Sequence, residues 1–266
     1  MTTKMTFAGT RAALAFALGA APAAALEGPR TPLDDPFDSA IFADRQVEVL
    51  GDPEKIRFDD RVIVRAPLSA EDSFNVPVEV DATALSDVEE IVVFVDWGPI
   101  PKILSYFPGK AEPRIALRFK IDQATPIRAA VRTADGAWHV GGTEIDAAGG
   151  GCTAPAVAYA ADDWEEKLGE VNGRLWADTG RVRMIVDHPM DTGLADGIPV
   201  YIIEDLELST PEGEVMARLQ LHEPVNEDPA FTLFFAEGSL PNTLELRGRD
   251  NGGAQIRATL RGAPTE

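Results

Sequence analysis

The chain has 266 residues, and its 44 acidic residues outnumber its 24 lysines and arginines to give a formal net charge of −20. So acidic a composition argues against nucleic acid or an anionic membrane surface as the partner. The length suits one large domain or two smaller ones.

Residues 1–25 have the pattern of a Sec-type signal peptide. Lys4 and Arg11 give a positive start, an apolar stretch follows, and small residues at Ala23–Ala25 precede a cleavage site before Leu26. The stretch is too short to span a bilayer, and no later segment is long and apolar enough to do so. We therefore expect this segment to be removed and the mature chain to reside in a periplasm.

Residues 26–57 form an N-terminal extension with one short predicted helix. Asp35 can cap it and Pro36 can occupy its first position. Phe37 and Ile41 then lie on one face, where both can be buried.

Residues 58–156 read as a β-sandwich because apolar residues recur with a period of two. A continuous apolar run at Ile91–Val95 predicts a strand that is covered on both faces. The other strands are expected around Val62, Val76–Val80, Ile115–Ile121, Ile127–Val131 and Trp138–Thr143.

This half ends in a glycine run that precedes Cys152, the only cysteine of the chain. Gly149, Gly150 and Gly151 leave the backbone unrestricted, which predicts a flexible arm that exposes the thiol. An unpaired cysteine in an exported protein indicates a reactive thiol or an intermolecular bond. The alternative is a small buried side chain without chemistry.

Residues 157–178 are expected to be a linker that contains a short helix. Asp162 and Glu165 have capping-box spacing, and Trp164, Leu168 and Val171 would share one face. Asn172-Gly173 would end this helix.

Residues 179–266 repeat the alternating pattern of the first half, with turns at Pro211-Glu212-Gly213 and Asp250-Asn251-Gly252-Gly253. Short strands with regular turns and few helices predict an all-β chain. We expect two immunoglobulin-like β-sandwich domains with a short helical linker, and extensive contact between them.

Short motifs in both halves match a known pair of proteins. Residues 58–156 resemble SoxY in Val76-Pro77-Val78, Pro99 and Pro101, Arg118-Phe119-Lys120 and Gly150-Gly151-Cys152. Residues 179–262 resemble SoxZ in Arg183 to His188, Pro189-Met190-Asp191-Thr192-Gly193, Ile198-Pro199, Glu227-Asp228-Pro229 and Asp250-Asn251-Gly252. The order of the two resembles the fused SoxYZ carriers that are associated with quinoprotein dehydrogenases.

The resemblance implies a periplasmic carrier, not an enzyme. In SoxY the cysteine lies on a flexible carboxy-terminal arm and holds sulfur intermediates, which makes Cys152 the attachment point. The implied partners are periplasmic redox enzymes: Sox-type proteins, c-type cytochromes or a PQQ-dependent dehydrogenase. Here the chain continues past Cys152 to Glu266, so its arm is tethered at both ends and enters a partner as a loop.

The remaining chemical inventory points to no cofactor and no metal. The three histidines, His139, His188 and His222, lack the spacing of metal ligands. His188 is expected to fix the His-Pro-Met turn. Two alternatives to the carrier stay open: a scaffolding protein that docks a quinoprotein dehydrogenase or a cytochrome with the thiol incidental, and, least favoured, a self-sufficient enzyme.

Overall fold

The computed structural model describes Met1, residues 34–160 and residues 162–262. The predicted signal-peptide cleavage site lies outside these described residues, as does the segment that precedes it apart from Met1. Within the described part of the chain, no helix is long and apolar enough to cross a membrane.

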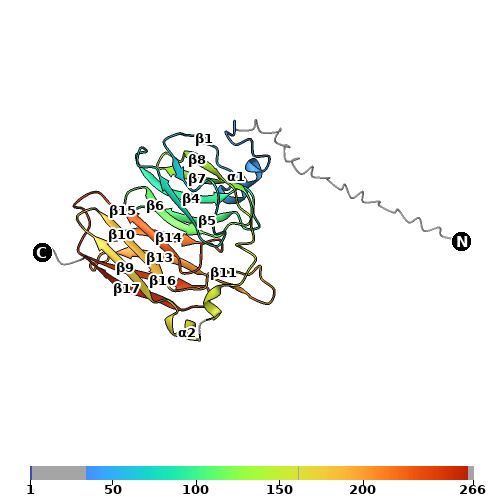
Figure 1. The fold of residues 1–266 in the computed structure, drawn as a ribbon. Helices are drawn as coiled ribbons and strands as arrows, with labels where there is room; N and C mark the ends of the chain where they lie inside the picture. The colour runs from blue at the N-terminus through green and yellow to red at the C-terminus, as the bar shows by residue number, and fades with distance from the viewer. Residues whose placement is uncertain (2–33, 161, 263–266) are drawn as a thin grey trace. The chain divides into compact units, whose positions relative to one another are not determined.

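Two large sheets face each other and make up most of the molecule (Figure 1). The larger has nine strands in the order β1 (Ile56–Phe58), β8 (Trp138–Ile145), β7 (Thr125–Thr133), β4 (Val88–Val95), β5 (Lys102–Phe107), β14 (Val215–Leu221), β13 (Ile203–Ser209), β16 (Thr243–Asp250) and β17 (Gln255–Arg261). The smaller has six strands in the order β2 (Ile63–Arg65), β3 (Val76–Asp81), β6 (Arg114–Phe119), β15 (Ala230–Phe234), β10 (Arg181–Val186) and β9 (Val171–Trp176). A separate pair consists of β11 (Asp191–Thr192) and β12 (Val200–Tyr201).

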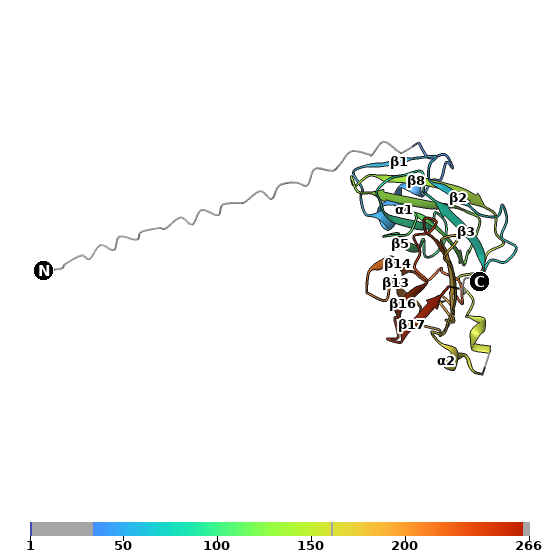
Figure 2. The same ribbon diagram turned by 90° about the vertical axis from the view of Figure 1, so that its left-hand side faces the viewer.

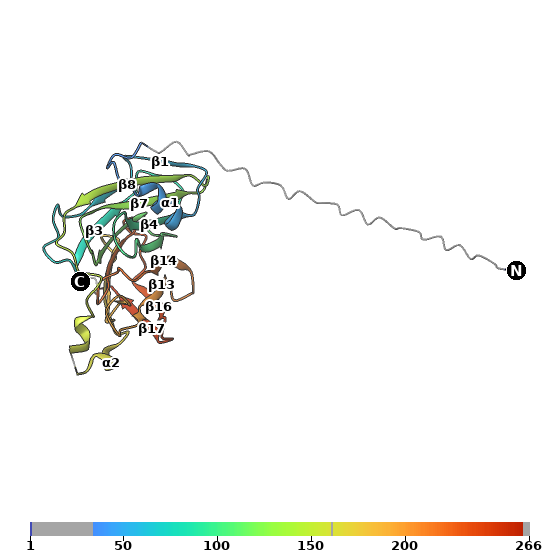
Figure 3. The same cartoon turned by 90° about the vertical axis from the view of Figure 1, so that its right-hand side faces the viewer.

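Both large sheets run without a break from the first half of the chain into the second. β5 pairs antiparallel with β14, and β6 pairs antiparallel with β15. Figure 2 shows β5, β14, β13, β16 and β17 following one another in this order, and Figure 3 shows the same order from β14 to β17. The predicted all-β fold with two immunoglobulin-like sandwiches is therefore confirmed, and their contact is as extensive as expected because the sheets themselves are shared.

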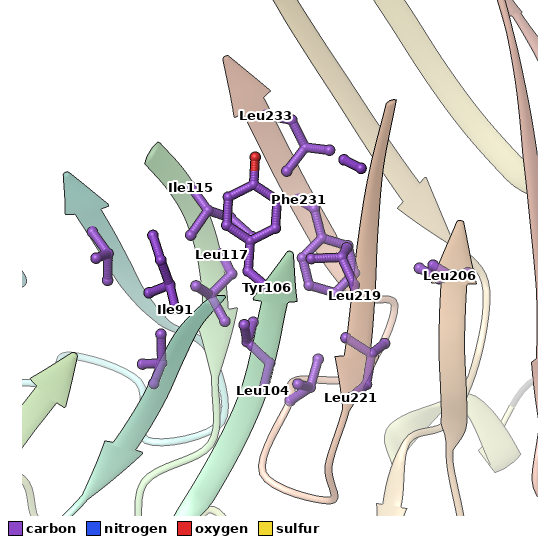
Figure 4. Close-up of a cluster of buried hydrophobic side chains, with 14 of the residues drawn as sticks. Ile91, Leu104, Tyr106, Ile115, Leu117, Leu206, Leu219, Leu221, Phe231 and Leu233 are labelled. Carbon is purple, nitrogen blue, oxygen red and sulfur yellow. The ribbon is translucent and has the colours of Figure 1, made fainter. Parts of the chain in front are cut away.

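The core is also shared between the halves (Figure 4). Tyr106 on β5 is paired with Leu219 on β14, and Leu104 is paired with Leu221. All four side chains are buried in one cluster that spans both sandwiches. Burial of apolar surface across this junction stabilises the two halves as one unit.

The alternating patterns placed most strands correctly, and β4 lies as the sequence predicted. Ile91 and Val93 face the main core, whereas Val92 and Phe94 pack into a second cluster on the other face of the sheet. The helix α1 (Phe42–Leu50) covers that second face through Phe42.

The predicted position of the first helix was wrong, and the linker helix was predicted too long. Residues 35–41 form a turn in which Asp35 accepts the N–H groups of Phe37 and Ser39, and the helix begins only at Phe42. The linker holds the 3-10 helix η1 (Val157–Ala160) and the short helix α2 (Trp164–Lys167), which confirms a short helical linker.

The predicted continuation of that helix through Val171 is wrong. Residues Val171–Trp176 form the strand β9, which pairs with β10 at the edge of the six-stranded sheet. Asp163, not Asp162, precedes α2, and its side chain makes no capping hydrogen bond. The second sandwich therefore begins earlier than the predicted boundary at residue 179.

A buried ion pair fastens the N-terminal extension to the first sandwich. The Arg128 guanidinium donates to both carboxylate oxygens of Asp35 and of Asp96, at 2.7 to 3.1 Å. Its side chain is fully buried, and it lies 4.5 Å from the Phe37 ring centre and 4.4 Å from that of Phe42. These contacts explain why the extension packs against the sheet.

Candidate functional site: the Cys152 segment

The segment around Cys152, residues 149–158, lies against the body of the protein. We call it the Cys152 segment. It leaves the first sandwich after β8 and is held first by Ile121, whose carbonyl accepts the Gly151 N–H at 3.0 Å. The glycines thus make defined backbone contacts in addition to giving the chain freedom.

Two of the glycines are required by close packing. A Cβ on Gly151 would lie 2.1 Å from the carbonyl oxygen of Ser73, and a Cβ on Gly149 would lie 2.3 Å from that of Asp122. Gly149 also has φ +92°, which disfavours any other residue. Gly150 has open space around it. Their predicted role as a flexible arm stays a prediction, and the structure shows the arm docked.

The thiol of Cys152 points inward, so the expectation of an exposed thiol is wrong. Only 3% of the residue is exposed, and Sγ donates to the Lys120 carbonyl oxygen at 3.6 Å. Burial raises the pKa of the Cys152 thiol to about 11, and the charge of Asp122 adds to this, whereas Lys120 opposes it. The group is therefore protonated at neutral pH and is a poor nucleophile in this position.

The second half of the chain holds the far side of the segment. Thr192 on β11 donates its hydroxyl to the Cys152 carbonyl oxygen at 2.5 Å. Asp191 accepts the Ala156 N–H at 3.0 Å, and the Glu227 carboxylate accepts the N–H groups of Val157 and Ala158 at 2.8 and 2.5 Å. The thiol thus lies in the junction between the two sandwiches.

Lys120 links these two sides. Its ammonium is buried and donates to the Met190 carbonyl oxygen. Burial lowers the pKa of Lys120, while the nearby acidic groups, Asp191 first, act to raise it. The cation can offset the negative charge of Asp191 beside the segment, because opposite charges attract strongly where water is excluded.

The His-Pro-Met turn is fixed by its own histidine, as predicted. His188 Nδ1 accepts the Met190 N–H at 3.0 Å, and this helps to hold Met190 at the unusual φ of +51°. Burial lowers the pKa of His188 to about 4, so its ring is neutral. No group of three or more His, Cys, Asp or Glu residues in the described chain could hold a metal ion.

Two family models match this chain, one in its first half and one in its second half. The model of sulfur oxidation protein SoxY matches residues 46–152, and that of sulphur oxidation protein SoxZ matches residues 172–261. This chain is a fused SoxYZ-like protein. No curated protein matches it.

One solved structure is similar to part of this chain. The sulfur carrier protein SoxY from Chlorobium limicola f thiosulfatophilum is 20% identical, and the match covers 40% of this chain and 96% of that one. The TM-score of this match is 0.35. The SoxY family match ends at Cys152 itself, and the SoxZ match begins at β9.

Sequence reasoning found Cys152 and missed the residues that hold it. Lys120, Asp191, Thr192 and Glu227 all occur in the motifs that carried the family resemblance, but nothing in their spacing tied them to the thiol. In the structure Asp191 and Thr192 lie on β11, Lys120 directly follows β6, and Glu227 lies in the loop before β15. The fold brings these residues together around the Cys152 segment. Lys120 of the SoxY half and Asp191, Thr192 and Glu227 of the SoxZ half therefore hold the Cys152 segment together, and we call these four residues its dock.

Proposed function

We propose that this chain holds a sulfur intermediate covalently on the Cys152 thiol and presents it to partner redox enzymes in a periplasm. Its family matches support a carrier role in sulfur oxidation, served by Sox-type enzymes. The observation that carries the finer proposal is the place of the thiol. Cys152 is the single cysteine of the chain, stands where the SoxY match ends, and follows glycines on a segment that hydrogen bonds hold at both sides.

Carriage requires the segment to leave its dock. A buried thiol with a raised pKa cannot attack a sulfur cargo, since the thiolate is the nucleophile. Once released into water, the same thiol regains an ordinary pKa. A partner then removes two electrons and the thiol proton as Sγ bonds to the cargo sulfur; c-type cytochromes or a PQQ-dependent dehydrogenase are the acceptors we propose for those electrons.

The docked position also favours a second candidate. If the thiol never leaves the junction, the protein is a scaffold that docks a quinoprotein dehydrogenase or cytochrome, and Cys152 only packs there. The two functions differ in what Cys152→Ser does. Loss of sulfur oxidation supports the carrier, and unchanged sulfur oxidation supports the scaffold.

Intact mass of the chain from cells oxidising a reduced sulfur compound tests the proposal. We expect a periplasmic protein that begins at Leu26 and carries a sulfur adduct, which a thiol reductant removes and which Cys152→Ser lacks. A chain that begins at Met1 would contradict export. An unmodified thiol under every sulfur-oxidising condition would contradict carriage.

A further inference from the structure

The outer face of the six-stranded sheet is rich in arginine. Residues along each strand alternate between the buried core and this face. The face carries six of the arginines of the chain: Arg65 on β2, Arg114 and Arg118 on β6, Arg181 and Arg183 on β10, and Arg174 on β9. We call it the arginine face. It stands out on a chain whose net charge is −20.

Few carboxylates balance these cations. Glu79 on β3 accepts from Arg65 at 2.8 Å and from Arg114 at 3.1 Å, and Asp81 lies 3.6 Å from Arg65. Within the described residues, the other four arginines of the face form no ion pair with a carboxylate. The face therefore keeps a positive charge that the protein itself does not use.

Aromatic rings hold three of the guanidinium groups in place. Arg114 lies over the Phe234 ring at 4.1 Å, and Arg181 and Arg174 lie over the Trp176 ring at 4.0 and 4.9 Å. Stacking keeps the planar donors oriented and weakly hydrated, which suits them to carboxylates. Less side-chain freedom is then lost when a partner binds.

The outer face of the nine-stranded sheet shows what an ordinary charged surface looks like in the same molecule. Its Arg249 pairs with Glu204 and Asp205, and its Arg218 lies 4.0 Å from Glu207. Among the described residues Arg247 and Arg257 form no ion pair, but they line one pocket together with Asp205 and Glu207, so cations and carboxylates are interspersed there. The imbalance is a property of the six-stranded sheet.

The size of the arginine face points to a macromolecule. Arg65 and Arg174 lie on the two edge strands, and five strand spacings separate them by about 24 Å. A groove of about 560 Å³ lies on this face, and it is lined by Arg65, Arg118 and Arg183, by Glu79, and by the small side chains of Ala116 and Ala230. A small anion could reach only one or two of these cations.

We propose that the arginine face docks a partner protein through a carboxylate-rich surface. The face measures about 500 Å² from its strand spacing and length, below the roughly 800 Å² per partner of stable complexes. Docking is therefore transient. At physiological salt the Debye length is about 8 Å, so more distant charges are largely screened. The attraction to a partner is therefore determined by the arginines of this face and not by the negative charge elsewhere on the chain.

Docking here places the partner beside the thiol. Arg118 precedes Phe119 and Lys120 on the chain, and the Lys120 carbonyl oxygen accepts the Cys152 thiol. A partner on the arginine face thus covers β6 up to the dock of the Cys152 segment. That this partner acts on the thiol rests on the proposed function; the docking itself does not.

An oligoglutamate peptide serves as the probe, titrated into the ¹⁵N-labelled chain at about 0.1 M salt. We expect amide shifts confined to the six strands of this sheet, β2, β3, β6, β15, β10 and β9, and binding that weakens as salt rises. R118E/R183E should lower the affinity about tenfold or more. The matched control R247E/R257E changes the charge equally at exposed positions of the other sheet and should alter the affinity less than about twofold.

Several results would overturn the proposal. They are shifts spread over the whole surface, equal losses in both double variants, no binding by the wild type, or sulfate producing the same shifts at equal ionic strength. Self-association that R118E/R183E abolishes would make a second copy the occupant instead. Cys152→Ser should bind the peptide as the wild type does, so a failure of carriage and a failure of docking are told apart.

Discussion

The hydrogen bond from Thr192 to the Cys152 carbonyl should control how often the thiol is available. Thr192→Val keeps the side-chain shape but removes the hydroxyl that donates at 2.5 Å. An unpaired buried carbonyl costs about 1–3 kcal/mol. The docked state should lose that amount relative to the released state, which raises the released fraction by about 5-fold to 150-fold.

Maleimide labelling followed by intact mass measures this fraction. With a pKa of about 11, the docked thiol has roughly 300-fold less thiolate at neutral pH than a free cysteine of pKa about 8.5. Labelling of the wild type should therefore be slow and should proceed through released molecules. Thr192→Val should label faster by the factor given above, with little change in the midpoint of urea unfolding.

Thr192→Ser is the matched control, because it retains the hydroxyl and should label at the wild-type rate. Wild-type labelling at the rate of an unstructured cysteine peptide would refute the docked thiol. Equal rates for Thr192→Val and Thr192→Ser would refute the role of the hydrogen bond.

Two further predictions concern stability. Arg128→Met should lower the free energy of unfolding in urea by about 3–5 kcal/mol, since it leaves Asp35 and Asp96 buried without their cation. Arg132→Met, which removes a half-exposed ion-paired arginine, should cost under about 1 kcal/mol, and equal losses would contradict the reasoning. His188 has a pKa lowered to about 4 when folded, so its contribution is complete above its unfolded pKa near 6.5 and is lost as pH falls towards 4. Urea titrations across that range should lose up to about 3 kcal/mol, and His188→Asn should flatten the dependence; an unchanged slope in His188→Asn would assign it to other groups.

The sequence predicts the strands well because their cause is local. Alternating residues can bury one face of a sheet in only one register, so patterns such as Val76, Val78 and Val80 determine a strand wherever it pairs. The strand β9 was missed for the opposite reason. Its residues Asn172 and Gly173 have weak strand preference, and pairing with β10 decides their conformation.

In the candidate site too, features with a local cause could be predicted from the sequence, whereas features that depend on distant residues could not. The glycines and Cys152 are visible in the sequence, and so is the flexibility that glycine permits. The burial of the thiol is not, because it depends on contacts with Lys120 and Thr192, which are distant in the chain. The Asp35 turn was misplaced for a similar reason: Arg128, far along the sequence, binds the carboxylate that was expected to cap a helix.

Fusion of the two halves limits how far the thiol can travel. On the SoxY side, five residues from Ala147 give Cys152 a reach of about 17 Å at full extension. On the SoxZ side, Ala156 lies only four residues after Cys152, and its N–H is hydrogen-bonded to Asp191. Four residues allow a reach of about 14 Å. If the Asp191 and Glu227 contacts persist on release, the SoxZ tether and not the glycine run sets the reach. The loop would then present the thiol close to its dock, where a partner already bound to the arginine face could meet it.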